Sequence, residues 1–183
     1  MSYIVDHKHK FENLLFQINN QDQLRKQANG GNSILFSYPP NEEYLYISKA
    51  FEIYAEKAEF IDVSQLLVKF IDESGWDDFK AYYNDYKDTP HKVFRSDSVS
   101  DIDLFDMIIG EIQSACQQDK LPFLIRTGCL YGTGIENLNI MEHKAVMSLS
   151  HPLIIFYPSS IEDGNLYFLN FKHASQYRGI LVN

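Results

Sequence analysis

Cysteine and tryptophan are scarce in this sequence. The chain has two cysteines, Cys116 and Cys129, and a single tryptophan. Cys116 falls in a helical pattern and Cys129 in a turn, which gives no sign of a disulfide framework. We therefore expect two reduced thiols, as is usual for a cytoplasmic protein.

Positive charge is also in short supply. Sixteen Lys and Arg residues stand against 25 Asp and Glu, for a net charge of −9. The densest basic stretch is only "LRKQ" at 24–27. Proteins that bind DNA or RNA directly neutralise phosphates with clustered Lys and Arg. We therefore expect no direct contact with nucleic acid.

Long apolar runs are absent as well. No stretch approaches the roughly 18 apolar residues that a membrane-spanning helix needs. The first residues, "MSYIVDHKHKFENLL", lack the uninterrupted apolar segment of a secretory signal. The expected location is the cytoplasm, with no membrane partner.

The residues that are present suit one globular domain. Apolar residues make up 45% of the chain and charged residues 22%, and 183 residues are enough for a full hydrophobic core. Phenylalanine (13) and tyrosine (12) are plentiful. Most of these rings suit a core, although surplus tyrosine is also typical of surfaces that bind other proteins.

Apolar strands and amphipathic helices alternate along the chain. Largely apolar stretches predict strands at 34–38, 121–127 and 153–157, and a further short strand is expected at 59–64. The alternation predicts an α/β fold, a single domain over 1–183 with a mostly parallel sheet flanked by helices. The tail predicts a short antiparallel edge.

Local signals give finer expectations. A helix should occupy much of 1–30, and the polar, aromatic segment 76–100 is the expected variable insertion. Asn41 is the expected N-cap of the helix after the first strand. Gly75 should close a helix, and Pro158 should end the last strongly buried strand.

The stretch "LPFLIRTGCLYGTGIENL" (121–138) raises the possibility of a phosphate site, because a buried strand breaks into a turn containing Gly128, Gly132 and Gly134. A dinucleotide fingerprint would need glycine where Asn137 stands, and a Walker A loop would need Gly-Lys after four intervening residues. The first strand is followed by "SYPPNEEY", which is acidic and rich in proline. We expect the glycines to serve backbone geometry, Arg126 to point away from the edge of the sheet, and no cofactor to bind.

The carboxyl ends of parallel strands converge on one edge of a sheet, which is the usual ligand edge of α/β folds. Polar and aromatic residues are predicted to gather there. The candidate ligand or partner edge consists of Tyr38, Asp62, Thr127, Gly128, Tyr131 and Tyr157. An edge without any ligand would carry the same residues, so both interpretations stay open.

Catalytic and metal patterns are weak. "DDFK" (77–80) has the Asp-x-Lys spacing of metal-dependent nucleases, with Asp62, Asp78 and Lys80 as the candidate residues, although its aromatic neighbours have helical spacing. "DHKH" (6–9) sits in a terminal segment, and the other histidines lack ligand spacing. No G-x-S-x-G is present, so neither a catalytic nucleophile nor a metal site is expected.

Three stretches together resemble the BrxB family of BREX bacteriophage-exclusion systems. They begin "ILFSYPPNEEYLYISKAFEIY" at 34, "EFIDVSQLLVKFI" at 59 and "PFLIRTGCLYGTGIENLNIM" at 122, and the last continues to the end of the chain. The more specific parts are the Thr-Gly pair at 127–128, "PLIIFYP" and a closing Tyr177-Arg178 pair. Relatives have an aromatic-rich segment where this chain has "GTGIENLNIM".

The resemblance implies a layout like that of P-loop NTPases without the phosphate loop. It further implies a non-enzymatic component of a phage-defence complex. Its partners would be other BREX proteins, above all the phosphatase-like PglZ and after it the ATPase BrxC, alongside a DNA methyltransferase.

Three functions therefore compete, and each makes a geometric demand. An adaptor needs an exposed apolar patch of more than a few hundred Å². A sensor for a nucleotide or small molecule needs a pocket at the strand edge with donors pointing inward. A nuclease needs Asp62 and Asp78 within roughly 4–6 Å, so that they can share a cation.

Overall fold

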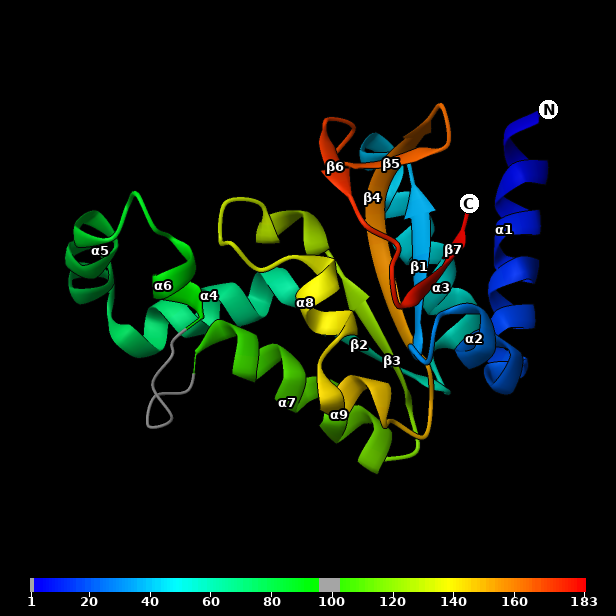
Figure 1. Cartoon of the computed structure of the whole chain (residues 1–183), viewed down its shortest axis with the longest axis horizontal. Coiled ribbons are helices and arrows are strands. Elements are labelled where there is room, and N and C mark those ends of the chain that lie inside the picture. Colours follow the sequence, from blue (N-terminus) through cyan, green and yellow to red (C-terminus); the bar gives the residue numbers. More distant parts are fainter. Residues whose placement is uncertain (1, 96–102) are drawn as a thin grey trace.

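The computed structural model describes residues 2–95 and 103–183, and side chains from residue 7 onward. It has the expected α/β architecture, a mostly parallel sheet between two layers of helices (Figure 1). The end of the expected insertion, 96–100, lies outside the described residues.

Five parallel strands form the main part of the sheet. Their spatial order is β2 (Ala58–Asp62), β3 (Leu121–Ile125), β4 (Leu153–Glu162), β1 (Ser33–Tyr38) and β7 (Gly179–Val182). β1 and β4 pair over six residues, from Ser33 opposite Leu153 to Tyr38 opposite Pro158. All six residues of β1 are buried, as its unbroken apolar pattern predicted.

The expected antiparallel edge is confirmed, but it involves only part of the tail. β4 continues past the parallel sheet and pairs antiparallel with β5 (Asn165–Phe168), which pairs in turn with β6 (Lys172–Ala174). The final strand, β7, lies parallel to β1. Pro158 therefore does not end β4, because beyond it the strand takes β5 as its partner.

Three helices cover one face of the sheet: α1 (Ser2–Asn19), α2 (Gln21–Gln27) and α3 (Glu43–Tyr54). They bury an aromatic core that includes Phe36, Tyr46, Phe123 and Phe156. α3 begins after a short 3-10 helix η1 (Pro40–Glu42), and its N-cap is Glu42 rather than the expected Asn41, because Pro40 starts a turn before the α-helix forms.

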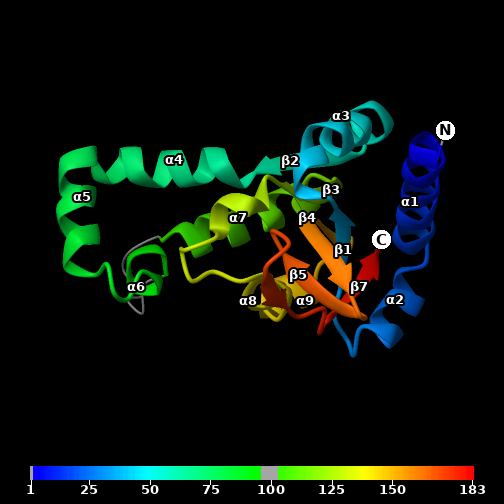
Figure 2. The same cartoon turned by 90° about the horizontal axis from the view of Figure 1, so that it is seen from above.

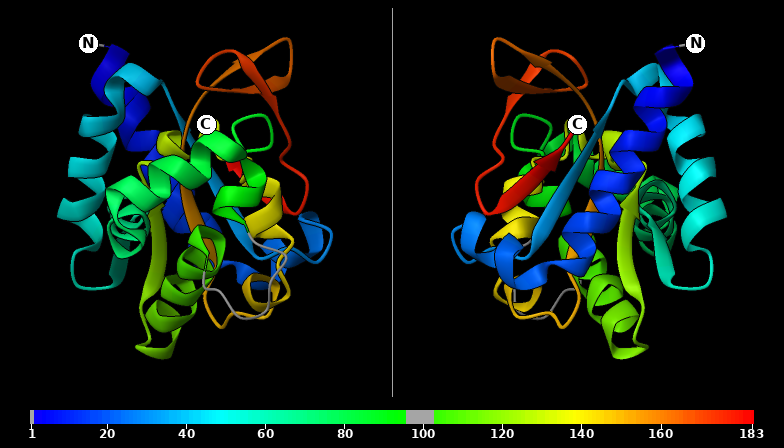
Figure 3. Two further views of the ribbon diagram at one scale, coloured as in Figure 1. Left: turned by 90° about the vertical axis from the view of Figure 1, so that its left-hand side faces the viewer. Right: turned by 90° about the vertical axis from the view of Figure 1, so that its right-hand side faces the viewer.

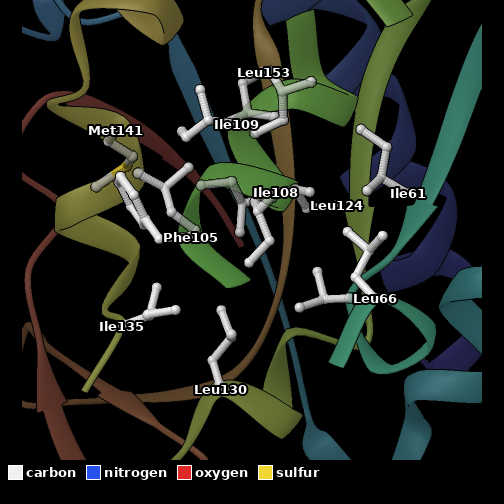
Figure 4. Packing of buried hydrophobic residues seen from close by; sticks show 14 of the residues in the cluster. Ile61, Leu66, Phe105, Ile108, Ile109, Leu124, Leu130, Ile135, Met141 and Leu153 are labelled. Atoms are coloured by element: carbon white, nitrogen blue, oxygen red, sulfur yellow. The ribbon is translucent and has the colours of Figure 1, made fainter. Parts of the chain in front are cut away.

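The other face is covered by α4 (Val63–Ser74), α7 (Leu104–Gln117), α8 (Asn137–Met141) and α9 (Lys144–Met147). Its core is mostly aliphatic: Ile108 and Ile109 of α7 lie among Leu124, Leu153 and Met141 (Figure 4). α8 and α9 are separate helices because the chain breaks at His143, whose backbone is extended.

α4 and α5 form a helical arm. α4 ends at Gly75, as predicted, and the φ of Gly75 is +77°. α5 (Trp76–Asp85) and α6 (His91–Phe94) follow at the end of α4 that is farthest from the sheet (Figure 2). The aromatic segment at 76 is thus helical, as its spacing indicated.

The Tyr177-Arg178 pair marks the entry to β7. The Arg178 guanidinium donates to the Asn29 carbonyl, and a Cβ on Gly31 would collide with the Arg178 carbonyl oxygen. Gly31 therefore allows the end of the chain to pack against the loop before β1.

Candidate functional site

The carboxyl edge of the sheet carries the sequence-predicted residues, but in separate groups. Ser37 of β1 lies opposite Tyr157 of β4, and Tyr38 opposite Pro158. Side chains one position apart on neighbouring strands point to opposite faces. Tyr38 accordingly packs in the aromatic core with α1 and α3, whereas Tyr157 packs in the aliphatic core.

Asp62 ends β2 and caps α4. One of its carboxylate oxygens accepts from the Ser64 amide at 3.0 Å, from the Gln65 amide at 3.3 Å and from the Ser64 hydroxyl at 2.6 Å. The other oxygen pairs with the Arg126 guanidinium at 2.8 Å. This carboxylate is therefore fully engaged as a helix cap and an ion pair.

Arg126 makes the turn after β3. Its φ of +57° is left-handed, and its side chain reaches across to Asp62. The expectation that Arg126 points away from the edge is therefore wrong. Its left-handed backbone interrupts the alternation of side-chain directions along β3, just before the 3-10 helix η2 (Thr127–Leu130) begins.

The three glycines of the turn differ in conformation. Gly132 and Gly134 have φ of +87° and +79°, whereas Gly128 is not among the positive-φ residues of the described chain. A Cβ on Gly134 would lie 2.5 Å from the His91 Cβ, but on Gly128 its nearest neighbour would be Leu169 at 3.5 Å. Only Gly132 and Gly134 therefore need glycine for their backbone conformation.

Thr127, Tyr131 and Tyr157 gather around a small cavity between η2, α8 and β6. The Thr127 hydroxyl donates to the Phe156 carbonyl at 2.6 Å, and the Tyr157 hydroxyl donates to the Asn137 side chain at 3.1 Å. The cavity measures about 30 Å³. That is room for one or two water molecules, whereas small-molecule sites typically measure about 300–1,000 Å³.

Glu136 and Lys172 form an ion pair of 2.8 Å at the rim of this cavity. Inside it, burial raises the pKa of Tyr157 well above its usual range, and the nearby Glu136 charge adds to the shift. Tyr157 is thus a neutral phenol at physiological pH, and its hydroxyl is already committed to Asn137.

Acidic groups also surround the end of β1. Tyr38 donates to the Glu43 carboxylate at 2.8 Å, and burial raises the pKa of Tyr38 far above its usual range. Burial, with smaller contributions from Asp62 and Glu43, raises the pKa of Cys129 to about 11. A thiol with a raised pKa is a poor nucleophile at neutral pH.

The geometry demanded of a nuclease is not met. Asp62 caps the first turn of α4 and Asp78 lies on α5, beyond the opposite end. A helix of 12 residues is about 18 Å long. The two carboxylates are therefore too far apart to share a cation.

Metal-ligating side chains do not cluster elsewhere in the described residues either. Within 2–95 and 103–183, no group of three or more His, Cys, Asp or Glu could hold a metal ion. The side chain of Asp6, part of the "DHKH" candidate, lies outside this description. His9 instead lies 3.3 Å from Glu12 on its own helix.

Sequence reasoning missed the residues that close this edge. Glu43, Asn137 and the Ser37–Ser159 hydroxyl pair all bond to a predicted residue or lie beside one. Neither Glu43 nor Asn137, which stands between Glu136 and Leu138, belongs to a sequence motif that marks its bonding partner. Their partners come from strands or helices distant in sequence, so no local pattern signals them.

Two exposed surfaces lie away from the strand edge. One is the arm helix α5, of which only Phe79 is buried among its ten residues in the described structure. The other is an apolar groove between α1 and α3. No described helix is long and apolar enough to cross a membrane.

Comparisons with protein-family models, with curated proteins and with solved structures each found no match.

Proposed function

We propose that this chain is a non-catalytic adaptor that acts through protein–protein contacts in a BREX-type phage-defence complex. The observation that carries the protein-binding part is the exposed aromatic face of α5. The assignment to phage defence rests on the sequence resemblance to the BrxB family.

The aromatic face of α5 is formed by Trp76, Phe79, Tyr82, Tyr83 and Tyr86. At 100° per residue these five positions fall within about 120° of the helix circumference. Phe79 anchors the helix by packing against Phe70 and Phe94, with ring centroids 6.2 and 6.0 Å apart. The remaining rings lie along the outer surface of the arm.

Exposure of these outer aromatic rings to water is unfavourable in free energy. Trp76 is 62% exposed and Tyr82 is 47% exposed, and the Tyr82 and Tyr86 ring centroids lie 4.8 Å apart with the rings tilted at 52°. Trp and Tyr are the residue types that most often dominate binding energy at protein interfaces. A solvent-facing aromatic stripe on a projecting arm is thus typical of a contact surface.

The sensor hypothesis has less support. It needs a pocket with free donors at the strand edge, and the polar groups there bond to one another around a cavity of about 30 Å³. The charges of Asp62 and Glu43 near Cys129 also disfavour a phosphate.

The test is a binding measurement with purified PglZ-type protein and, separately, with BrxC from a BREX operon. We expect a complex with PglZ in titration calorimetry. Changing Trp76, Tyr82 and Tyr86 together to Ala should weaken it at least about tenfold, since each hot-spot truncation typically costs more than about 1 kcal/mol.

The matched control changes Tyr44 and Phe171 to Ala. These side chains are 68% and 59% exposed but lie off the arm, so affinity should not change. If the protein binds neither the PglZ-type protein nor BrxC, the proposed partners are wrong. If the arm variant binds as tightly as the wild type, α5 is not the contact surface.

A further inference from the structure

The outer end of the arm carries negative charge as well as aromatic rings. Over residues 76–88, four aspartates stand against two lysines, and all six of these side chains are exposed. In the left view of Figure 3, which faces the end of the arm, α5 lies nearest to the viewer and the sheet lies behind it. A partner that approaches the arm therefore meets a negatively charged surface.

Two of the carboxylates flank the Tyr82–Tyr86 pair. Asp78 is four residues before Tyr82 and Asp85 is three residues after it, which are the spacings of neighbours on a helix surface. At 100° per residue, Asp78 and Asp85 lie about 40° and 60° from Tyr82 around the helix. Lys80 lies about 160° from Tyr82 and thus on the other side of α5.

These carboxylates have no partner within the described part of the chain. Neither Asp78 nor Asp85 makes an ion pair or a side-chain hydrogen bond there, and Asp85 is not paired with the nearby Lys87. Asp85 also ends α5, whose last turn has no basic residue. A carboxylate is unfavourable at the C-terminal end of a helix, where the helix dipole places partial negative charge. A cation bound beside Asp85 would relieve this unfavourable interaction.

The two tyrosine rings suit a cation as well. Tyr82 and Tyr86 are 47% and 36% exposed, and their ring centroids lie 4.8 Å apart. A cation over the face of an aromatic ring is attracted by the quadrupole of the ring, and arginine makes this contact more often than lysine. The planar guanidinium can stack on a ring while its N–H groups donate to a carboxylate. Exposed rings with neighbouring carboxylates offer both contacts.

We propose that the Tyr82–Tyr86 pair, together with Asp78 and Asp85, binds an arginine side chain in a basic segment of the partner protein. The inference rests on the proposed adaptor function and names the chemistry of the partner segment at the same surface. A purely apolar segment would bury the two carboxylates without a partner, which is costly. Nucleic acid is disfavoured because its phosphates would be repelled by the same carboxylates.

The experiment selects peptides from a random display library against the wild-type protein, with counter-selection against the Tyr82→Ala/Tyr86→Ala protein. The retained peptides are synthesised and titrated by fluorescence anisotropy. We expect them to contain arginine. Replacing that arginine by citrulline, which keeps the shape but not the charge, should weaken binding at least about tenfold. Raising the ionic strength from about 0.1 M to about 1 M shortens the Debye length from about 10 Å to about 3 Å and should weaken binding too.

The carboxylates are tested by Asp78→Asn/Asp85→Asn, which keeps the rings and the side-chain size. This variant should bind the arginine peptides about three- to tenfold more weakly, since each exposed charge contact contributes a factor of a few. The matched control, Asp77→Asn/Glu111→Gln, removes the same charge from two other exposed positions. Asp77 lies about 140° from Tyr82 around α5, and Glu111 lies on α7. The control should bind like the wild type, and melting temperatures close to the wild-type value show that each variant folds.

Several results would overturn the proposal: no binder, retained peptides without enrichment of arginine, or equal binding by the wild-type and Asp78→Asn/Asp85→Asn proteins. An equal loss of affinity in the control variant would mean that net charge, not these two carboxylates, attracts the peptides. Retained peptides that are apolar and insensitive to salt would assign the aromatic face of α5 to an apolar segment instead.

The adaptor function is tested separately by the binding of the PglZ-type protein and BrxC. If Asp78→Asn/Asp85→Asn binds a BREX protein as tightly as the wild type does, while the arm variant does not bind, this inference fails and the adaptor function stands. If the arginine peptides bind as described but neither BREX protein binds, the proposed partners are wrong and the arginine site stands.

Discussion

At the residue scale, replacing neighbouring glycines in the turn after β3 by alanine should lower the free energy of unfolding by different amounts. Gly134 has φ +79° and no room for a Cβ beside His91, so Gly134→Ala should cost about 1–3 kcal/mol of unfolding free energy. Gly128→Ala, with ordinary contacts, should change stability by less than about 1 kcal/mol. Urea unfolding of both variants checks this, and a larger loss at Gly128 than at Gly134 would contradict the turn geometry.

Cys129 should make stability depend on alkaline pH. Its pKa is raised to about 11, mainly by burial, so the folded state holds the thiol proton more tightly than the unfolded state does. The resulting contribution to the free energy of unfolding is fully present below the unfolded pKa of about 8.5, and it is lost as the pH rises through about 11. The stability difference between wild type and Cys129→Ala should therefore shrink from pH 8 to pH 11.

Thermal unfolding at a series of pH values measures this difference. Cys116→Ala is the parallel variant, since burial also raises the pKa of Cys116. A difference between wild type and Cys129→Ala that grows with pH would mean that the Cys129 thiolate is stabilised in the folded protein.

At the scale of elements, Asp62 joins β2, α4 and the turn after β3. Asp62→Ala removes the cap of α4 and the Arg126 ion pair, and should cost about 1–2 kcal/mol. Asp62→Asn keeps a capping oxygen and should cost less, because the ion pair is half exposed on the Arg126 side. Equal losses in chemical denaturation would mean that the charge, not the cap, is what matters.

β4 is central for its first half and an edge hairpin for its second. Phe156 is fully buried between β1 and β3, so Phe156→Ala should cost about 3–5 kcal/mol. Ile161, on the same strand but 37% exposed, should cost less than about 1.5 kcal/mol when changed to Ala. Similar losses in urea unfolding would contradict the placement of β4 in the sheet.

Elements with strong local signals were predicted well. β1, β3 and the start of β4 are unbroken apolar runs, and Gly75 ends α4 as its position indicated. The prediction that Pro158 ends the strand was wrong. Proline usually ends a strand, but here β4 continues and changes its partner from β1 to β5. That exchange depends on the tail folding back, which no local pattern encodes.

At the scale of the whole molecule, the sequence predicts that six residues lie at one edge of the sheet. It does not predict to which face of the sheet each side chain points. Tyr38 and Tyr157 end neighbouring strands, yet a register offset of one residue sends them into different cores. The arm and the groove were not predicted as surfaces, because exposure depends on which helices pack over which face. Periodicity alone shows that a helix has an apolar side, not whether that side is covered.

The central claim is that the strand edge is closed by its own hydrogen bonds and that the contact surfaces lie elsewhere. The most direct test is the melting temperature of the purified protein with and without millimolar ATP, GTP or NAD. Saturation of one site at 100 times Kd would add about 2.7 kcal/mol, a shift of several degrees for a domain of this size. We predict no reproducible shift with any of the three, and a shift of several degrees with one of them would contradict the account and favour a sensor.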